Sequence, residues 1–210
     1  MGRVITLQPG QTLSEADAAA VAAAALQAKA IVFPTDTVYG LGSTGLIKAA
    51  VRRLYELKGR DAMKPLPILI DCAEAAKRWV EWTPAAEALA SRFWPGPLTL
   101  VLKPTKEGRL LTFPEFPTLA IRVPAHPVAL QILRAAAGPL AVTSANRSGE
   151  AAISSGIQAA RAFGGVAEFV VDAGEAGGRE STLVDATGVP VRVLREGALS
   201  RQRILEAVPA

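Results

Sequence analysis

Residues 30–42 read Ala30-Ile31-Val32-Phe33-Pro34-Thr35-Asp36-Thr37-Val38-Tyr39-Gly40-Leu41-Gly42. The stretch begins with an apolar run, typical of a short buried strand, which Pro34 halts. An alanine-rich segment precedes it and begins after Ser14, with Asp17 three residues later, the pattern of a capped helix start. Its high helix propensity predicts a helix to about Lys29. A helix followed by a strand is the alternation expected of an α/β fold.

This alternation continues along the chain. Helical spacing of apolar residues, or proline at a first helical position, predicts helices at 51–58, 83–94, 127–137 and 157–163, and a short capped helix from 200. Short apolar runs predict strands at 67–71, 98–103, 118–123, 140–143, 168–171, 181–185 and 191–194. We therefore predict an α/β fold whose sheet is at least partly parallel or mixed, with antiparallel pairs among the closely spaced last strands. No repeat or linker is evident, so we expect a single domain over residues 1–210.

Composition narrows the class of protein. Half of the 210 residues are hydrophobic and a fifth are charged, so the chain can bury a full core. The net charge of +4 suits an anionic partner such as a nucleotide or RNA, although many ordinary enzymes share it. We find no signal pattern and no membrane span, and therefore expect a cytoplasmic protein without a membrane partner.

The chain has one cysteine, Cys72, and one histidine, His126. This excludes an intrachain disulfide and a metal site built from Cys and His. We expect Cys72 to be a small buried side chain. His126, between two prolines, is expected on the surface or at a helix cap, with a general-base role as the alternative.

Polar loops follow directly on apolar strands, where open α/β sheets place ligands. The first holds Thr35, Asp36 and Thr37, either as ligands or as a turn in which Asp36 and Thr37 bond their own backbone. The second holds Lys58, Arg60 and Lys64 within seven residues. These cations suit a triphosphate or a carboxylate, because a guanidinium grips phosphate oxygens in pairs, but they could also cap the helix end. Neither a Walker A loop nor a Gly-x-Gly-x-x-Gly fingerprint occurs.

The third loop, 143–149, follows a strand and holds Ser144 and Asn146. Ser144 lacks both a Gly-x-Ser-x-Gly elbow and a histidine placed to activate it, so we interpret both residues as hydrogen-bonding ligands or, alternatively, as a loop cap. Arg122 and Arg195 end apolar strands shortly before a proline or a glycine, and each could face a pocket or the surface. The stretch 93–97 is interpreted as structural.

Taken in order, these segments resemble the YrdC-like family of threonylcarbamoyl-AMP synthases. The resemblance rests on PTDTVYGLG (34–42), KGR (58–60) with KPL (64–66), WPGPLT (94–99), TLAIRVP (118–124), TSANRSG (143–149), STLVD (181–185) and REG (195–197). It implies a twisted mixed parallel and antiparallel α/β sheet with flanking helices and a concave, positively charged groove.

The resemblance also implies the synthesis of threonylcarbamoyl-AMP and pyrophosphate from ATP, bicarbonate and L-threonine, for modification of tRNA adenosine 37. The family's Lys-x-Arg and Ser-x-Asn pairs, central to nucleotide binding and turnover, fall on Lys58, Arg60, Ser144 and Asn146. ATP would be held by Arg60, Lys64, Thr118, Asn146, Ser154 and Arg195, and L-threonine by Thr35, Arg122, Ser144 and Ser181.

Further implications concern cofactor and partners. Mg²⁺ would accompany ATP, and no metal ligand of the chain itself is identified. The product would pass to a separate tRNA-modifying transferase complex, and the protein could also contact tRNA or double-stranded RNA. Longer relatives add a C-terminal domain, and we expect the short single-domain form here.

Two residues depart from the family pattern, and two alternative functions stay open. Asp61 stands where proline is frequent and could hold a cation partner or Mg²⁺, or point to water. Leu69 replaces a histidine that contacts threonine in some relatives, so the threonine methyl could meet an apolar wall. One alternative is a non-catalytic RNA-binding or ribosome-assembly module, although aromatic stacking positions among the basic residues are missing. The other is a carbamoyl-adenylate domain of the hydrogenase-maturation type, which is normally multidomain with cysteine motifs.

Overall fold

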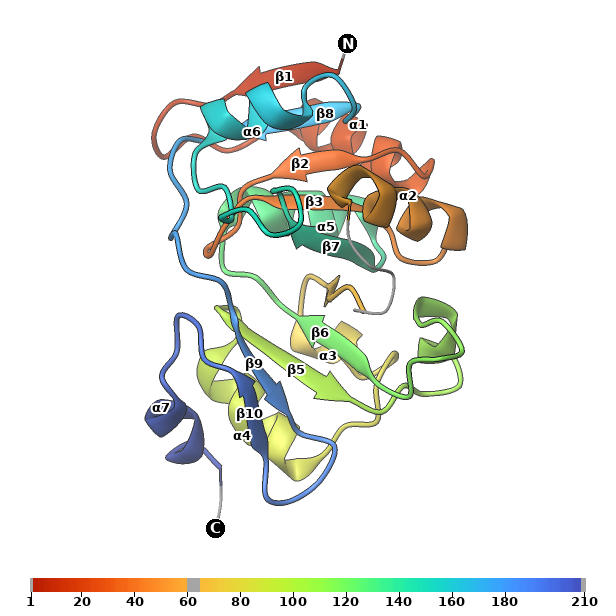
Figure 1. Ribbon diagram of the computed structural model, residues 1–210, viewed down its shortest axis with the longest axis vertical. Helices are drawn as coiled ribbons and strands as arrows, with labels where there is room; N and C mark the ends of the chain where they lie inside the picture. Colours follow the sequence, from red (N-terminus) through yellow and green to blue (C-terminus); the bar gives the residue numbers. More distant parts are fainter. Residues whose placement is uncertain (1, 60–64, 209–210) are drawn as a thin grey trace.

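The computed structural model describes residues 2–59 and 65–208. Its strands form one mixed sheet in the order β1-β8-β2-β3-β7-β4-β6-β5-β9-β10 (Figure 1). The strands are β1 (Arg3–Thr6), β2 (Ile31–Phe33), β3 (Gly40–Thr44), β4 (Ile68–Leu69), β5 (Leu98–Leu102), β6 (Leu119–Arg122), β7 (Leu140–Ser144), β8 (Phe169–Asp172), β9 (Thr182–Asp185) and β10 (Arg192–Arg195). Both parallel and antiparallel pairs occur, which confirms the predicted mixed α/β fold.

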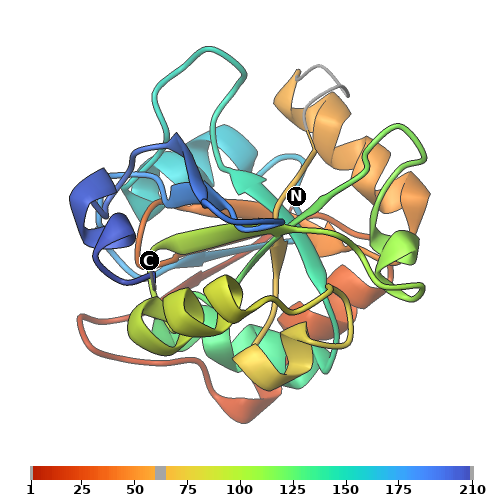
Figure 2. The ribbon, with the colours of Figure 1, turned by 90° about the horizontal axis from the view of Figure 1, so that it is seen from below.

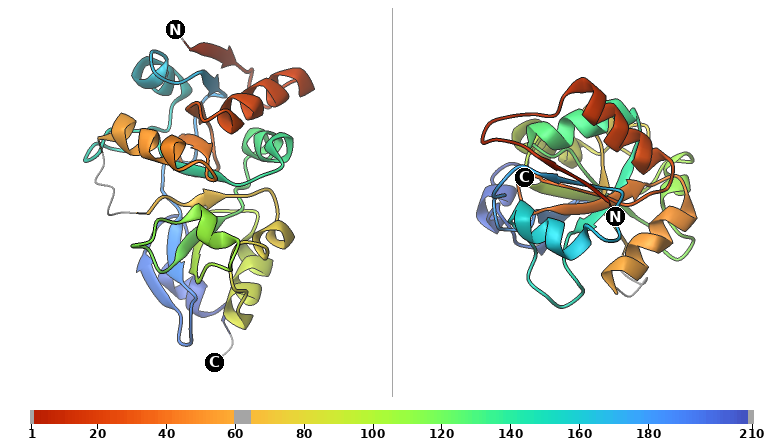
Figure 3. Two further views of the ribbon diagram at one scale, coloured as in Figure 1. Left: turned by 90° about the vertical axis from the view of Figure 1, so that its right-hand side faces the viewer. Right: turned by 90° about the horizontal axis from the view of Figure 1, so that it is seen from above.

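Helices cover both faces of the sheet (Figure 3). The helices are α1 (Glu15–Leu26), α2 (Lys48–Lys58), α3 (Ala73–Ala76), α4 (Pro84–Phe93), α5 (Pro127–Ala136), α6 (Gly156–Phe163) and α7 (Arg201–Leu205), with a 3₁₀ turn at Gly108–Leu111. One core packs α1 and α5 against the sheet through residues such as Val21, Ile31 and Ile132. A second core lies on the other face of the sheet, where α2 and α6 cover the half with β1, β8, β2, β3 and β7. It continues into the other half, which holds β5 and packs against α4, through residues such as Leu54, Leu89 and Phe163. None of the described helices is long and apolar enough to cross a membrane.

Side-chain caps fix several helix starts at the predicted positions. The Ser14 hydroxyl accepts a hydrogen bond from the Asp17 N–H at 3.1 Å. Thr83 caps α4 by accepting from the Ala86 N–H at 3.0 Å, ahead of a proline at the first helical position. His126 caps α5, because its Nδ1 accepts from the backbone N–H two residues on at 3.2 Å. The predicted capping role of His126 is thereby confirmed.

Other predictions about single elements were wrong. Helix α1 ends at Leu26 rather than near Lys29, since Ala28 adopts a positive φ of 65°. Cys72 is exposed, not buried, because it stands at the start of α3, where its sulfur accepts from the Ala75 N–H at 3.4 Å. Strands β1 and β3, helix α3 and the 3₁₀ turn were not predicted.

The pairing of the last strands was predicted only in part. Strands β9 and β10 are antiparallel, as expected. Strand β8, however, pairs in parallel with β1 and β2, at the opposite end of the sheet from β9 and β10. The chain therefore passes from one end of the sheet to the other after β8, and residues 173–181 run down the left side of the molecule in Figure 1.

Candidate active site

A cavity of about 380 Å³ lies between the two halves of the sheet, within the range of roughly 300–1,000 Å³ of small-molecule pockets. Its wall is built from the loop after β2 and from β5, β6, β7, β9 and β10. Six predicted site residues line it: Thr35, Thr118, Arg122, Ser144, Ser181 and Arg195. The fold thus brings together residues from loops and strands that are far apart in the sequence.

One side of the cavity is apolar. Leu69, a buried residue of β4, lines it together with Val101, Ala120 and Leu183 from the neighbouring half of the sheet. The prediction that Leu69 forms an apolar wall of the site agrees with this position. Its contact with a ligand methyl stays a prediction.

The loop after β2 is organised by Thr35. Its hydroxyl donates to the Val38 carbonyl at 2.6 Å and accepts from the N–H groups of Thr37 and Val38 at 3.2 and 3.3 Å. Thr35 therefore makes these local hydrogen bonds to the backbone. The turn predicted as an alternative to a ligand site assigned such bonds to Asp36 and Thr37 instead. The Asp36 side chain instead reaches away from its own loop.

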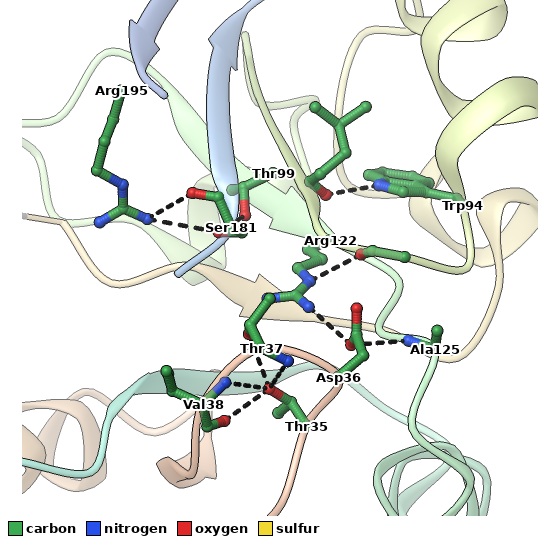
Figure 4. Close-up of polar contacts among 12 residues, drawn as sticks. Thr35, Asp36, Thr37, Val38, Trp94, Thr99, Arg122, Ala125, Ser181 and Arg195 are labelled. Carbon is green, nitrogen blue, oxygen red and sulfur yellow. Dashed lines mark hydrogen bonds and ion pairs between the residues drawn. The ribbon is translucent and has the colours of Figure 1, made fainter. Parts of the chain in front are cut away.

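Arg122 is almost completely enclosed, with 5% of its surface exposed. Its Nε donates to the Gly96 carbonyl at 2.9 Å, its Nη1 to the Thr37 hydroxyl at 2.9 Å, and its Nη2 to Asp36 Oδ1 at 2.7 Å (Figure 4). Burial lowers the pKa of Arg122, and the Asp36 carboxylate opposes that effect. A guanidinium carries five N–H donors, and these bonds use three of them, so two have no partner among the described residues. Arg122 itself lines the cavity.

Arg195 approaches the same cavity from β10. Its Nη1 lies 2.7 Å from Glu180 Oε2, and its Nη2 donates to the Ser181 carbonyl at 3.0 Å (Figure 4). The Ser181 hydroxyl lies 2.8 Å from the Thr99 hydroxyl and 3.4 Å from Arg195 Nη2. Arg195 therefore already holds a carboxylate, Glu180, that a phosphate would have to displace or share.

Lys58 joins two predicted motifs. It is buried, with 5% of its surface exposed, and its Nζ donates to the Ser144 carbonyl at 2.7 Å, the Ser144 hydroxyl at 2.8 Å and Asn146 Oδ1 at 2.7 Å. Asn146 Nδ2 donates in turn to the carbonyls of Arg147 and Glu150 at 2.9 and 2.7 Å. The Lys-x-Arg and Ser-x-Asn motifs thus meet through Lys58, which does more than cap its own helix.

Lys58 and Asn146 do not line the cavity but a second hollow of about 680 Å³ beside it. Figure 2 shows α2 and the loop between β7 and α6 on the same side of the molecule. The Ser148 N–H donates to the Lys58 carbonyl at 2.9 Å, which ties this loop to the end of α2. Because Lys58 bonds Ser144, it stands directly behind the cavity wall.

Ser154 is separate from this arrangement. Ser154 does not line the cavity, and its hydroxyl lies 3.4 Å from Glu175 Oε2. The described residues do not include Arg60 and Lys64. They also do not include Asp61, which departs from the family pattern.

Sequence reasoning missed several residues of the site. Gly96, in the segment interpreted as structural, supplies a carbonyl to Arg122, and a main-chain acceptor leaves no signal in a sequence. Tyr39 lines the cavity, donates to the Gly174 carbonyl at 2.8 Å and accepts from the Ala173 N–H at 3.0 Å. Burial raises the pKa of Tyr39 to about 12, so it stays protonated and ties two loops together.

The charges of the cavity are largely balanced. Arg122 faces Asp36, and Arg195 faces Glu180. Lys58 adds a positive charge behind the wall. The concave basic groove therefore stays a prediction. Within residues 2–59 and 65–208, no group of three or more His, Cys, Asp or Glu side chains could hold a metal ion.

Comparison with known proteins places this geometry in context. The family model of the Sua5, YciO and YrdC proteins, described as "Telomere recombination", matches residues 24–197. Threonylcarbamoyl-AMP synthase of Pyrococcus abyssi is 41% identical over 184 residues, which are 87% of this chain and 54% of the relative. The Bacillus subtilis threonylcarbamoyl-AMP synthase is 40% identical over 195 residues, 90% of this chain and 56% of the relative. The chain thus spans about half the length of these curated relatives.

A solved structure, P. abyssi Sua5 complexed with L-threonine, matches with a TM-score of 0.90 and 37% identity. The match covers 98% of this chain and 62% of that one.

Proposed function

The chain belongs to the Sua5/YciO/YrdC family, and we propose on that premise that it is a nucleotidyltransferase making threonylcarbamoyl-AMP. The substrates would be ATP, bicarbonate and L-threonine, and the second product pyrophosphate. The observation that carries the proposal is the convergence of Arg122, Arg195 and Ser144 on one cavity, with Lys58 bonded to Ser144 from behind. The names of the relatives and the threonine complex of Sua5 support the choice of substrate.

L-Threonine would bind at the Arg122 end of the cavity. The two N–H groups of Arg122 that remain available could bind its carboxylate, an arrangement that guanidinium geometry favours. Ser181 and the Thr35 loop line the same space, and Leu69 would face the threonine methyl. This assignment places the threonine carboxylate at Arg122 and its methyl at Leu69.

ATP would lie toward Arg195 and Thr118, which line the cavity from β10 and from the start of β6. By family resemblance, Arg60, Lys64, Asn146 and Ser154 would also contribute. Mg²⁺ would enter as part of the Mg–ATP substrate, with the triphosphate oxygens as its principal ligands. The described residues themselves offer no cluster of acidic and histidine ligands for a resident ion.

The proposed reaction needs no covalent enzyme intermediate. The threonine amine attacks the carbon of CO₂ with loss of a proton, or that of bicarbonate with loss of water, and becomes an N-carboxylate. An oxygen of that carboxylate attacks the α-phosphorus of ATP, and pyrophosphate leaves. The protein would act by holding the reactants close together and by offsetting negative charge, the means by which phosphoryl-transfer enzymes generally work. Ser144 would donate its proton into the cavity, because its oxygen already accepts from Lys58.

The test is pyrophosphate release from ATP by purified protein. We expect release that requires both threonine and bicarbonate, and ATP turnover that ignores threonine would refute the proposal. A tRNA-modifying transferase complex would use the product in the cytoplasm, and direct tRNA binding stays a hypothesis. The RNA-binding alternative predicts instead a salt-dependent tRNA affinity that survives substitution of Ser144 and Asn146. The relatives, which are synthases by name, do not favour that alternative.

A further inference from the structure

Asp36 lies in direct contact with Arg122 but does not itself line the cavity. The two side chains form an ion pair at 2.7 Å, with 6% of the Arg122 side chain and 17% of the Asp36 side chain exposed. An arginine so deeply buried requires a partner of opposite charge, because an unpaired buried charge is costly. Asp36 is that partner.

The carboxylate of Asp36 is itself held in place. Its Oδ1 accepts from Arg122 Nη2 and also from the Ala125 N–H at 2.9 Å, three residues beyond Arg122 in the chain (Figure 4). The backbone of Asp36 is enclosed as well, since a Cβ on Gly177 would come within 2.5 Å of the Asp36 carbonyl oxygen. One oxygen therefore fixes both the guanidinium and the chain that follows β6.

The other contacts of Arg122 hold two of its nitrogens through neutral groups, and Asp36 adds the third contact and the charged one. The bond to the Gly96 carbonyl holds Nε, and the bond to the Thr37 hydroxyl holds Nη1. Without Asp36, Nη2 would lose its acceptor, and the guanidinium would be held less firmly, by two neutral partners. With it, the two remaining N–H groups are directed before any ligand arrives, and such preorganisation lowers the cost of binding.

We propose that Asp36 is a positioning residue for threonine recognition, which acts only through Arg122. The inference rests on the proposed function, in which Arg122 binds the threonine carboxylate. Asp36 makes no contact with substrate in this scheme and takes no part in the chemistry. Its loss should weaken threonine binding while ATP binding is kept.

Three variants separate geometry from charge and from stability. Asp36→Ala removes both the charge and the acceptor. Asp36→Asn removes the charge but keeps an oxygen for Arg122 and Ala125. Asp185→Ala is the matched control, since Asp185 is similarly buried, pairs with Arg192 at 2.5 Å and does not line the cavity.

The readout is the KM for threonine and for ATP in pyrophosphate release. The bond between Asp36 and Arg122 exists with and without threonine, so only the cost of ordering the guanidinium on binding enters the KM. We expect a rise of about three- to tenfold in the threonine KM for Asp36→Ala. The ATP KM should change by less than about twofold, since Arg195 is untouched. In folded Asp36→Asn the threonine KM should stay within about twofold of the wild type, because its oxygen keeps the hydrogen-bond geometry, whereas the lost counter-charge of the buried Arg122 should appear as a lower Tm. Equal effects of Asp36→Ala on both KM values, or none, would overturn the proposal.

A double-mutant cycle tests whether Asp36 acts through Arg122 alone. In an Arg122→Lys background, Asp36→Ala should raise the threonine KM by less than about twofold further, because the guanidinium it positions is gone. Two effects that multiply would contradict the inference. If Asp36→Ala is too unstable to assay, Asp36→Glu takes its place. It keeps the charge but displaces the oxygen, so an unchanged threonine KM would refute the proposal.

A spectroscopic measurement separates this inference from the proposed function. The guanidinium N–H signals of Arg122, assigned by their loss in Arg122→Lys, should exchange slowly with water in the wild type and in Asp36→Asn. They should exchange fast in Asp36→Ala. Slow exchange in Asp36→Ala would overturn the positioning role, whichever substrate the protein uses. Threonine-independent turnover in the wild type would instead refute the proposed function.

Discussion

Replacing Lys58 by Met should lower the activity of the protein far more than its thermal stability. Lys58 Nζ donates three hydrogen bonds of 2.7–2.8 Å. In Lys58→Met the Ser144 carbonyl keeps its bond from the Asn146 N–H at 2.9 Å, and the Ser144 hydroxyl lines the cavity, where it can turn to other partners. Asn146 Oδ1 loses its charged donor, and one buried acceptor without a donor costs about 1–3 kcal/mol.

That cost converts into a modest loss of thermal stability. For a chain of this length, 1 kcal/mol lowers the Tm by about 2–4 °C, so the Tm of Lys58→Met should fall by about 2–12 °C. Activity should fall much further, because the two side chains that Lys58 aligns lose their common anchor. We expect a loss of at least about 100-fold in kcat/KM, equivalent to about 2.7 kcal/mol of transition-state stabilisation.

The assay is threonine-dependent pyrophosphate release well below the Tm, with unfolding followed separately by circular dichroism. The control is Lys29→Met, which removes a surface pair with Glu168 in which 47% of the Lys29 side chain is exposed. An exposed pair of this kind contributes at most about 1 kcal/mol, so this variant should stay active and nearly as stable as the wild type. A folded Lys58→Met that keeps a third or more of the activity would refute the role given to Lys58.

Two further predictions concern stability. Burial lowers the pKa of His126, so its neutral form is favoured in the folded protein, and the stability present above about pH 6.5 should be lost as the pH falls through the folded pKa. Thermal melts between pH 7 and pH 5 should show a weaker pH dependence in His126→Asn, which keeps a good helix cap, and an unaltered dependence would contradict the assignment. A Cβ on Gly156 would lie 1.8 Å from Asp172 Oδ1 and 2.7 Å from the Tyr39 hydroxyl, so Gly156→Ala should destabilise by about 1–3 kcal/mol in chemical denaturation. Gly165→Ala, where nothing lies within 4 Å, should be near neutral, and equal effects of the two would count against the packing described here.

The elements that follow local rules could be predicted from the sequence. Ser14 and Thr83 start their helices because a side-chain oxygen accepts a free N–H of the first turn, which depends on only a few neighbouring residues. Strand β3 was missed because its glycines favour turns. In the fold they are needed for close approach, since a Cβ on Gly40 would lie 2.7 Å from Val142 Cγ1 of the paired strand β7. That requirement belongs to the partner strand and cannot be read from the glycines alone.

The site also contains residues that could be predicted from the sequence and others that could not. The cations and hydroxyls at strand ends could be found because sheet topology gathers strand ends at one place. Their partners could not: the Asp36–Arg122 pair joins residues 86 positions apart, and the Gly96 carbonyl has no side chain to mark it. Likewise, the position of β8 beside β1 and β2 depends on a crossover that the closeness of the last strands conceals.

The most direct test of the central claim is detection of the product by mass spectrometry. Purified protein would be mixed with Mg²⁺, ATP, L-threonine and ¹³C-labelled bicarbonate. We predict a species with the mass of threonylcarbamoyl-AMP that carries the labelled carbon and disappears when threonine is omitted. ATP consumption without that species, or a species that lacks the label, would contradict the account.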